Sequence, residues 1–518
     1  MSFESVVGGQ WLNRLGIIAV LVGLSYFLKL AFENNWIGPA TRVLIGLALG
    51  VGLLLWSERF RRRGFPAFGY SLKAIGIGAL YLSLWAAFQF YHLVPASLAF
   101  AGMVLVTLTS AALALGQDAE LLSAFALVGG FLTPVLISTN QNQQVSLMCY
   151  LLLLDLGTFW VVAAKGWKRL LPGAFAGTAL LFAGWAASYY SDRQLGTTTV
   201  FATIFFVLFA PAGFIGQTDR TPAASFQQML QALVVVNGVV YFTALFLMME
   251  VNHSNLLAWL TLATAGFYFV LSRAVLRSGA AAHWESLHVG LAIAFLTASI
   301  PIAFNGRWIT FTWDLESALL LWVALQGGRR LLRLCGMGVL LLAAVRLMVA
   351  DSSYEPTLLL NPRFGLFLLT IGVSAFLVYV LRLRDDQESR QLAGGAIIAI
   401  NLLALLALSL EVQDYFKPQL QLATGERLRQ LETIRSFTYS ALWMMYGTAL
   451  MWVGFWKRQA FLRWQAIVLL AITTIKVFFI DISTLQRGYR IAAFIVLGVV
   501  LLAVSFFYQR LRVSASER

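Results

Sequence analysis

The segment FLRWQAIVLLAITTIKVFFIDISTLQRGYRIAAFIVLGVVLLAVSFFYQRLR at residues 461–512 consists of two long apolar runs joined by a short polar turn. A transmembrane α-helix needs about 20 consecutive apolar residues, and each run approaches that length. Lys476, Asp481 and Arg490 lie at the edges of the turn, and arginines stand at both outer ends of the segment. The segment therefore predicts a hairpin of two membrane-spanning helices.

Two other parts of the chain follow the same plan, residues 331–384 closely and the N-terminal region more faintly. Each copy carries a base, a carboxylate and a second base at its turn. These three sets, called the hinge residues below, are Lys29, Glu33 and Arg42; Arg346, Asp351 and Arg363; and Lys476, Asp481 and Arg490. Residues 309–384 and 436–512 predict two three-span units with the same membrane direction, unlike the inverted repeats of many transporters.

The composition of all 518 residues agrees with this interpretation. Hydrophobic residues make up 60 % of the chain and charged residues only 12 %, whereas a soluble domain has about 25 % charged residues. The alternating short strands of a membrane β-barrel do not occur in the sequence. We expect an all-α, polytopic transmembrane bundle of about 18 spans with same-direction repeats of helix hairpins.

The net charge of +14 does not indicate a nucleic-acid partner. The Lys and Arg residues lie between the apolar runs, in every second connection, as the positive-inside rule expects. This pattern places both termini in the cytoplasm, and membrane lipids are the expected partners. The oligomeric state is left open.

The spans group into five regions. The expected regions are a five-span bundle at 1–144, a six-span bundle at 145–308, a first repeat unit at 309–390, a linking span with the longest outer loop at 391–435, and a second repeat unit at 436–518. The longest loop, Gln413–Arg435, contains GERLRQLETIR, which has leucine and isoleucine at spacings of three. It is either a short helix on the outer surface or a solvated loop.

Several stretches resemble a large bacterial family of many-spanning "predicted membrane proteins", a domain of unknown function. The stretches are GGQWLNRLG (8–16), FLKLAFENNWIGPATRVLIGL (27–47), RFRRRG (59–64), LYLSLWAAFQFYHLVPASLAF (80–100), GGFLTP (129–134), WDLESALLLW (313–322) and KVFFIDIS (476–483). The resemblance implies a multi-pass protein of the bacterial inner membrane. It implies no reaction, so it assigns no catalytic residue.

Polar groups inside the expected spans are candidates for function, because a charge at the centre of a membrane helix costs about 2.5–3.5 kcal/mol on insertion scales. Asp155 is the deepest carboxylate, and it is either a proton- or ion-coupling group or a hydrogen-bonded structural one. Asn237-Gly238 and the GGFLTP motif mark either broken helices at a binding site or close helix packing.

Asp314 and Glu316 lie at the expected outer mouth of a span. Such a pair holds a divalent cation beside a lipid phosphate in membrane glycosyltransferases. Here the two residues fall on different helix faces and no third ligand is visible, so no metal is expected. We find no nucleotide-binding or nucleophile motif, and therefore expect no cofactor.

The hinge residues have two interpretations. In the first, each carboxylate pairs with a base and clamps the hairpin, Asp351 preferably with Arg363 and Asp481 with Arg490. In the second, the surplus positive charge binds an anionic substrate or lipid headgroup at the outer membrane boundary.

Three functions remain open. The leading hypothesis is a transporter without its own ATPase, or a protein that handles lipids or envelope precursors. It predicts a cavity near Asp155 or Asn237. The alternatives are a transferase acting on a lipid-linked substrate, with an outward cavity near Asp314 and Glu316, and an envelope scaffold without catalysis.

Overall fold

A computed structural model describes residues 18–20, 22, 23, 25, 26, 38–138, 141–212, 224–277, 282–327, 330–384 and 386–481. Every regular element in these ranges is helical. Thirteen of the described helices are long and apolar enough to cross a membrane. The all-α membrane fold is therefore confirmed. The first expected span is described only in part, and the last expected span lies outside the described residues, as do Lys29, Glu33 and Arg490.

The chain divides into two compact units, Met1–His253 with Val270–His288, and Ser254–Phe269 with Val289–Arg518. The first unit contains α3 (Pro39–Arg62), α4 (Pro66–Trp85), α5 (Ala96–Gly116), α6 (Glu120–Leu136), α7 (Gln144–Lys165), α8 (Leu170–Tyr189), α9 (Leu195–Phe209) and α10 (Ala224–Met249). A π-helical turn, Ala86–Phe90, extends α4.

Two helices, α11 (Ser254–Arg277) and α12 (Ala282–Ala303), are divided between the units. The second unit contains α13 (Trp308–Gly327), α14 (Arg330–Val349), α15 (Pro362–Arg382), α16 (Gln387–Leu422), α17 (Gly425–Trp456) and α18 (Ala460–Lys476). A π-helical turn, Val477–Asp481, follows α18.

Local sequence explains where several helices begin and end. Proline occupies the first turn of α3, α4 and α15, where its missing N–H costs no helical hydrogen bond. The side chains of Asn361 and Asp386 cap α15 and α16 by accepting hydrogen bonds from backbone N–H groups at 2.7 and 2.9 Å. Gly166, with φ of 74°, ends α7 in the left-handed conformation that glycine adopts readily.

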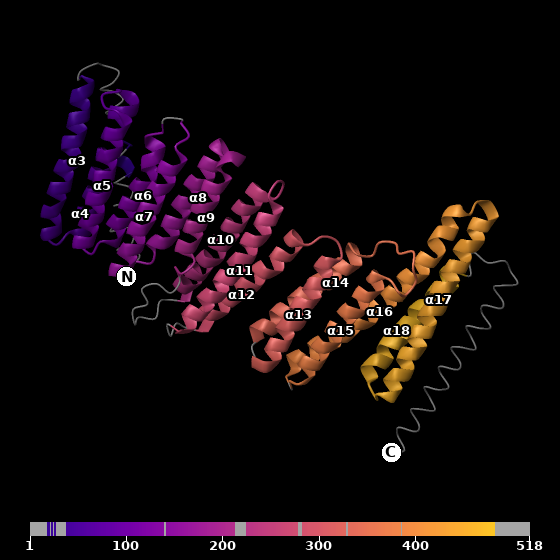
Figure 1. Ribbon diagram of the computed structural model, residues 1–518. Helices are drawn as coiled ribbons and strands as arrows, with labels where there is room; N and C mark the ends of the chain where they lie inside the picture. Colours follow the sequence, from indigo (N-terminus) through magenta and orange to yellow (C-terminus); the bar gives the residue numbers. More distant parts are fainter. Residues whose placement is uncertain are drawn as a thin grey trace. The chain divides into compact units, whose positions relative to one another are not determined.

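Consecutive helices pair as antiparallel hairpins within each unit, as Figure 1 shows. In the α3–α4 hairpin, a Cβ added at Gly76 would lie 2.8 Å from the carbonyl oxygen of Gly50. The two backbones thus touch through paired glycines. Small residues at helix contacts are the usual means of association in lipid, where apolar burial alone gives little driving force.

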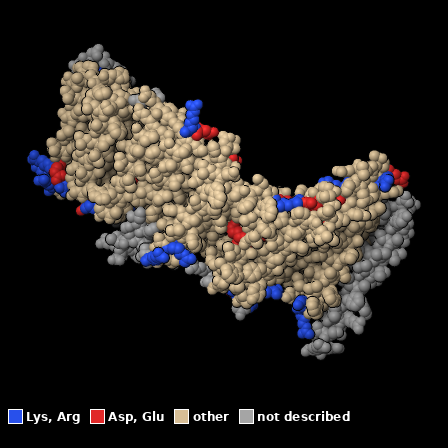
Figure 2. Space-filling view, in the orientation of Figure 1, with Lys and Arg blue, Asp and Glu red and all other residues tan. Residues whose placement is uncertain are grey.

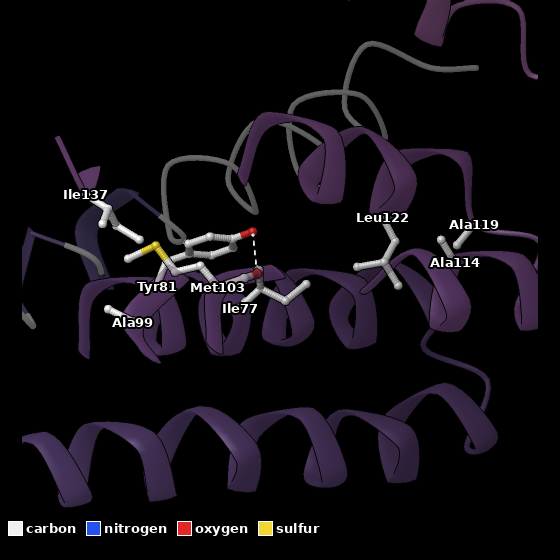
Figure 3. Packing of buried hydrophobic residues seen from close by; sticks show 8 residues of the cluster. All are labelled: Ile77, Tyr81, Ala99, Met103, Ala114, Ala119, Leu122 and Ile137. Carbon is white, nitrogen blue, oxygen red and sulfur yellow. Dashed lines mark hydrogen bonds between the residues drawn. The ribbon is translucent and has the colours of Figure 1, made fainter. Parts of the chain in front are cut away.

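One cluster of buried residues in the first unit, formed around Tyr81, is apolar except for the tyrosine hydroxyl. Tyr81, from α4, packs against Met103 of α5, and its hydroxyl donates to the Met103 carbonyl oxygen at 3.4 Å (Figure 3). The same hydroxyl lies 2.5 Å from the Thr107 hydroxyl. On the face in Figure 2, most charged side chains lie near helix ends, and broad uncharged surface lies between them. This distribution fits a membrane-embedded bundle.

The GGFLTP motif lies at the C-terminal end of α6. A Cβ at Gly129 would come within 2.6 Å of the Tyr81 ring, so glycine permits this close contact. Pro134 has no N–H to donate to the carbonyl oxygen of Gly130, one turn earlier. The Tyr150 hydroxyl from α7 donates to that oxygen instead, at 2.7 Å. The motif therefore serves close packing.

The alternative of broken helices is wrong at both places. Helix α6 continues through Gly129 and Pro134 to Leu136, and α10 continues through Asn237 to Met249. The backbone group that Pro134 leaves without a donor is satisfied by a neighbouring helix, as membrane proteins require.

The region Gln413–Arg435, expected as the longest outer loop, is helical almost throughout. Helix α16 continues to Leu422 and α17 begins at Gly425, whose φ is 60°. At 36 residues, α16 is about 54 Å long, whereas the hydrocarbon core is about 30 Å thick. The α16–α17 hairpin is therefore longer than the membrane core by several turns.

We predict that Tyr150→Phe lowers the free energy of unfolding by about 1 kcal/mol, because it leaves the Gly130 carbonyl oxygen without a donor. In a Pro134→Ala background, the alanine N–H can supply the missing bond, so Tyr150→Phe should cost less there. Thermal unfolding of purified protein measures both costs. The exposed Tyr379→Phe serves as the control, and equal costs in the two backgrounds would refute this role of Tyr150.

Candidate functional site

Arg363 is the most deeply buried hinge base in the described part of the chain, with 1 % of its surface exposed. It begins α15, and its guanidinium donates to two carboxylates of α16. The distances are 2.7 Å from Nη2 to Oε1 of Glu411 and 2.5 Å from Nη1 to Oδ2 of Asp414. The two carboxylates are three residues apart, so they share a helix face. This group is called the Arg363 cluster below.

The connection between α14 and α15 is tied to the same two carboxylates. The Leu359 N–H donates to Oε2 of Glu411 at 2.8 Å, and the Glu355 N–H donates to Oδ2 of Asp414 at 3.0 Å. The Asn361 side chain donates to Oε1 of Glu411 at 3.0 Å. Because the carboxylates accept from both side chain and backbone, the cluster fixes the connection against α16.

Asp351 pairs with a hinge base, as expected, but the preference for Arg363 over Arg346 is wrong. Asp351 lies 3.8 Å from Nε of the other hinge base, Arg346, and also accepts a hydrogen bond from Thr310. Arg363 pairs with α16 because Glu411 and Asp414 follow a long apolar run and face α15. Sequence reasoning overlooked them, although two carboxylates three residues apart at the end of an expected span were the available signal.

In both repeat units, the first base of the hinge donates a hydrogen bond to a backbone carbonyl oxygen at an equivalent position. Arg346 Nη2 donates to the carbonyl oxygen of Gly306 at 3.3 Å, and Lys476 Nζ donates to that of Ser436 at 3.0 Å. Donor and acceptor are 40 residues apart in both cases. This is compatible with a same-direction repeat, whose second unit extends beyond the described residues.

The remaining hinge residues give a partial comparison. Arg42 is buried, and its Nη1 lies 3.5 Å from the Tyr91 hydroxyl. Lys29, Glu33 and Arg490 lie outside the described residues, as does the side chain of Asp481. The preference of Asp481 for Arg490 therefore stays a prediction.

Asp314 and Glu316 do not form a pair. Asp314 is fully buried, and its Oδ2 accepts from the Thr370 hydroxyl of α15 at 2.7 Å. Glu316 accepts at Oε1 from the Thr297 hydroxyl of α12 at 2.8 Å. The carboxyl groups thus bond to helices on different sides of α13, which does not suit joint coordination of a cation.

Asp155 is also fully buried. Its Oδ2 accepts from the Thr178 hydroxyl of α8 at 2.7 Å, while Oδ1 has no partner among the described residues. A carboxyl group with one bonded and one unbonded oxygen can accept a proton or a ligand in the membrane. Asn237, also buried, donates to the carbonyl oxygen of Phe206 in α9 at 3.0 Å.

Thr178 and Asn237 line one cavity, called the α8–α10 cavity below. It has a volume of about 510 Å³ and lies between α8, α9 and α10. The small side chains of alanines on α8, including Ala179 and Ala183, leave room for the cavity. Phenylalanine side chains such as Phe205 form much of its wall. The cavity is almost entirely apolar, and the hydroxyl that holds Asp155 lies in its wall.

Lys73 of α4 is buried. Its Nζ lies 3.3 Å from Oε2 of Glu58 in α3 and also bonds to Gln117 after α5. A further ion pair joins Lys165 to Asp118. The orientation prediction places these four loop-proximal charges on one side of the membrane, and their contacts are consistent with it.

We predict that Arg363→Met lowers the free energy of unfolding by about 3–5 kcal/mol, because it leaves two buried carboxylates without their cation. Adding Glu411→Gln and Asp414→Asn should restore much of the loss. Thermal unfolding in detergent or nanodiscs measures this. The exposed Arg427→Met is the matched control, and a loss no larger than the control's would contradict the clamp.

Comparison with known proteins gives a family. The family described as "Predicted membrane protein (DUF2339)" matches residues 8–354 and 337–511. No curated protein and no solved structure matches the chain. The matches cover nearly the whole sequence and agree with the many apolar helices, so the chain belongs to the DUF2339 family of predicted membrane proteins.

Proposed function

We propose that this protein is a membrane transporter for compounds with an apolar chain, such as lipids or lipid-linked envelope precursors, and that the α8–α10 cavity is its binding site. One observation supports the proposal above all. The deeply buried Asp155 carboxyl group is hydrogen-bonded to Thr178, and Thr178 lines an apolar cavity inside the bundle. The leading sequence hypothesis required a cavity at this place.

The size and chemistry of the cavity support an apolar chain. A volume of about 510 Å³ is within the range of small-molecule sites. Its walls offer phenylalanine and alanine surface, with the Asn237 amide and the Thr178 hydroxyl as polar groups. An apolar chain would bury its surface there, while a polar end could bond to these two groups.

Asp155 is the proposed coupling group. Its free Oδ1 can bind a proton, and its Oδ2 is bonded to a residue of the cavity wall. A change in its protonation would therefore change the hydrogen bond to Thr178. Polar residues of this kind mark proton relays and substrate pathways in membrane proteins. Arg363 and Arg346 each pair with a carboxylate, Asp414 and Asp351 respectively, so we do not include these two bases in the proposed binding site.

The test is a lipid-transfer assay in proteoliposomes. The chain is reconstituted with a trace of acyl-labelled fluorescent phospholipid, and a membrane-impermeant reductant reports movement between leaflets. We expect the wild type to accelerate movement over empty liposomes. Ala183→Trp should slow it at least several-fold by filling the cavity, and Asp155→Asn should abolish any response to an imposed pH gradient.

Leu180→Trp is the matched control, because Leu180 lies on α8, is exposed, and does not line the cavity. It should leave the rate within about twofold, since a surface substitution away from packed contacts usually has little effect. Equal effects of Ala183→Trp and Leu180→Trp, or no acceleration by the wild type with acyl-labelled or lipid-linked probes, would overturn the proposal.

A further inference from the structure

A second and larger cavity lies in the first unit, on the other side of α8. Its volume is about 700 Å³, and α5, α6, α7, α8 and the connection after α6 contribute to its walls. It is called the α5–α8 cavity below. Trp185 and Tyr189 of α8 face it, whereas Ala183 and Ala187 of the same helix line the α8–α10 cavity.

The cavity lies at the C-terminal end of α6, which is a short helix. With 17 residues, α6 is shorter than its neighbours α5, α7 and α8, which have 21, 22 and 20. It ends at Leu136, just beyond Pro134, and residues of α5, α7 and α8 line the hollow beside this end. Pro134 itself lines that hollow.

The walls combine aromatic rings with uncharged polar groups. Trp185 and Tyr150 supply ring surface, Gln141 and Gln143 supply amides, and Ser146 is one of several serines. None of the described residues that line the cavity is Lys, Arg, Asp or Glu. An ionic ligand would therefore lose its hydration without gaining an opposite charge, which is costly.

Two of the aromatic side chains are held in place. The indole Nε1–H of Trp185 donates to Oδ1 of Asn142 at 3.0 Å, and Trp185 is buried. The Tyr150 hydroxyl donates to the Gly130 carbonyl oxygen at 2.7 Å, and its ring packs edge-on against Phe100 at 5.3 Å between centroids. Because these rings are already fixed, less entropy is lost when a ligand packs on them.

We propose that the α5–α8 cavity binds an uncharged, hydroxyl-rich headgroup, namely a sugar. A sugar ring has apolar C–H faces that pack on aromatic rings, and its hydroxyls donate to and accept from amides and serine hydroxyls. Binding does not require the α8–α10 cavity to transport, so this inference stands independently of the proposed function. The sugar is either free or carried by a lipid.

The test uses the full chain in phosphatidylcholine nanodiscs, prepared without glycoside detergent. The probe is an alkyl maltoside that carries a photoactivatable diazirine on its sugar, added below its critical micelle concentration. We expect mass spectrometry to find labelled peptides from the walls of the α5–α8 cavity. Loss of label with excess maltose would identify a site for free sugar, and loss only with unlabelled alkyl maltoside would identify a site for a lipid-linked sugar.

Matched variants make the test specific to the site. Gln143→Leu, at an exposed position, and Trp185→Phe should each lower labelling of these peptides at least fivefold. Gln430→Leu and Trp160→Phe, at exposed positions outside the cavity, should leave it unchanged. Equal labelling of these peptides by an alkyl phosphocholine diazirine would show that the cavity does not select a sugar. Labelling of other peptides instead, or labelling that neither cavity variant lowers, would also overturn the proposal.

Discussion

The absence of water in the bilayer core governs this structure, because every polar group there must find a partner within the protein. Two contacts illustrate the constraint, one inside a span and one buried in the protein at the expected outer membrane boundary. The Tyr150 hydroxyl bonds to the carbonyl oxygen that Pro134 leaves without a donor, so a proline is tolerated inside α6. Arg363 is buried because Glu411 and Asp414 meet it with two carboxylates. Both contacts join different helices, so they also determine which helices lie together.

The degree to which a buried group is satisfied separates structural residues from candidate functional ones. In the Arg363 cluster, the carboxylates accept from the guanidinium and from backbone N–H groups. Asp155 and Asp314 each accept one threonine hydroxyl, and each has a second oxygen without a partner among the described residues. A fold gains nothing from such an oxygen, since burying an unbonded polar atom is unfavourable. The incomplete bonding of Asp155 beside an apolar cavity is therefore the main reason to assign it a role in function.

Much of the fold could be predicted from the sequence, because the length of an apolar run and the placement of Lys and Arg report directly on membrane crossing. The carboxylate pair Glu411 and Asp414 is visible in the sequence, but its contact with Arg363 is not, because the two are 48 and 51 residues away and only packing brings α16 against α15. A helix over GERLRQLETIR was one of two alternatives, but its continuity with α17 was not foreseen, since its polar residues resemble those of a loop. Among the candidate site residues, Asp155 and Asn237 were identified correctly as buried polar groups, but the cavity depends on alanines of α8 that carry no distinctive signal.

We propose the α8–α10 cavity beside Thr178 and Asp155 as the binding site for an apolar chain. The most direct measurement is a cryo-electron microscopy map of the full chain in nanodiscs made from native lipid extract. We expect elongated density between α8 and α10, ending near the Asn237 amide. Direct contact of α8 with α10, with Phe182 and Leu247 side chains filling the space, would contradict it.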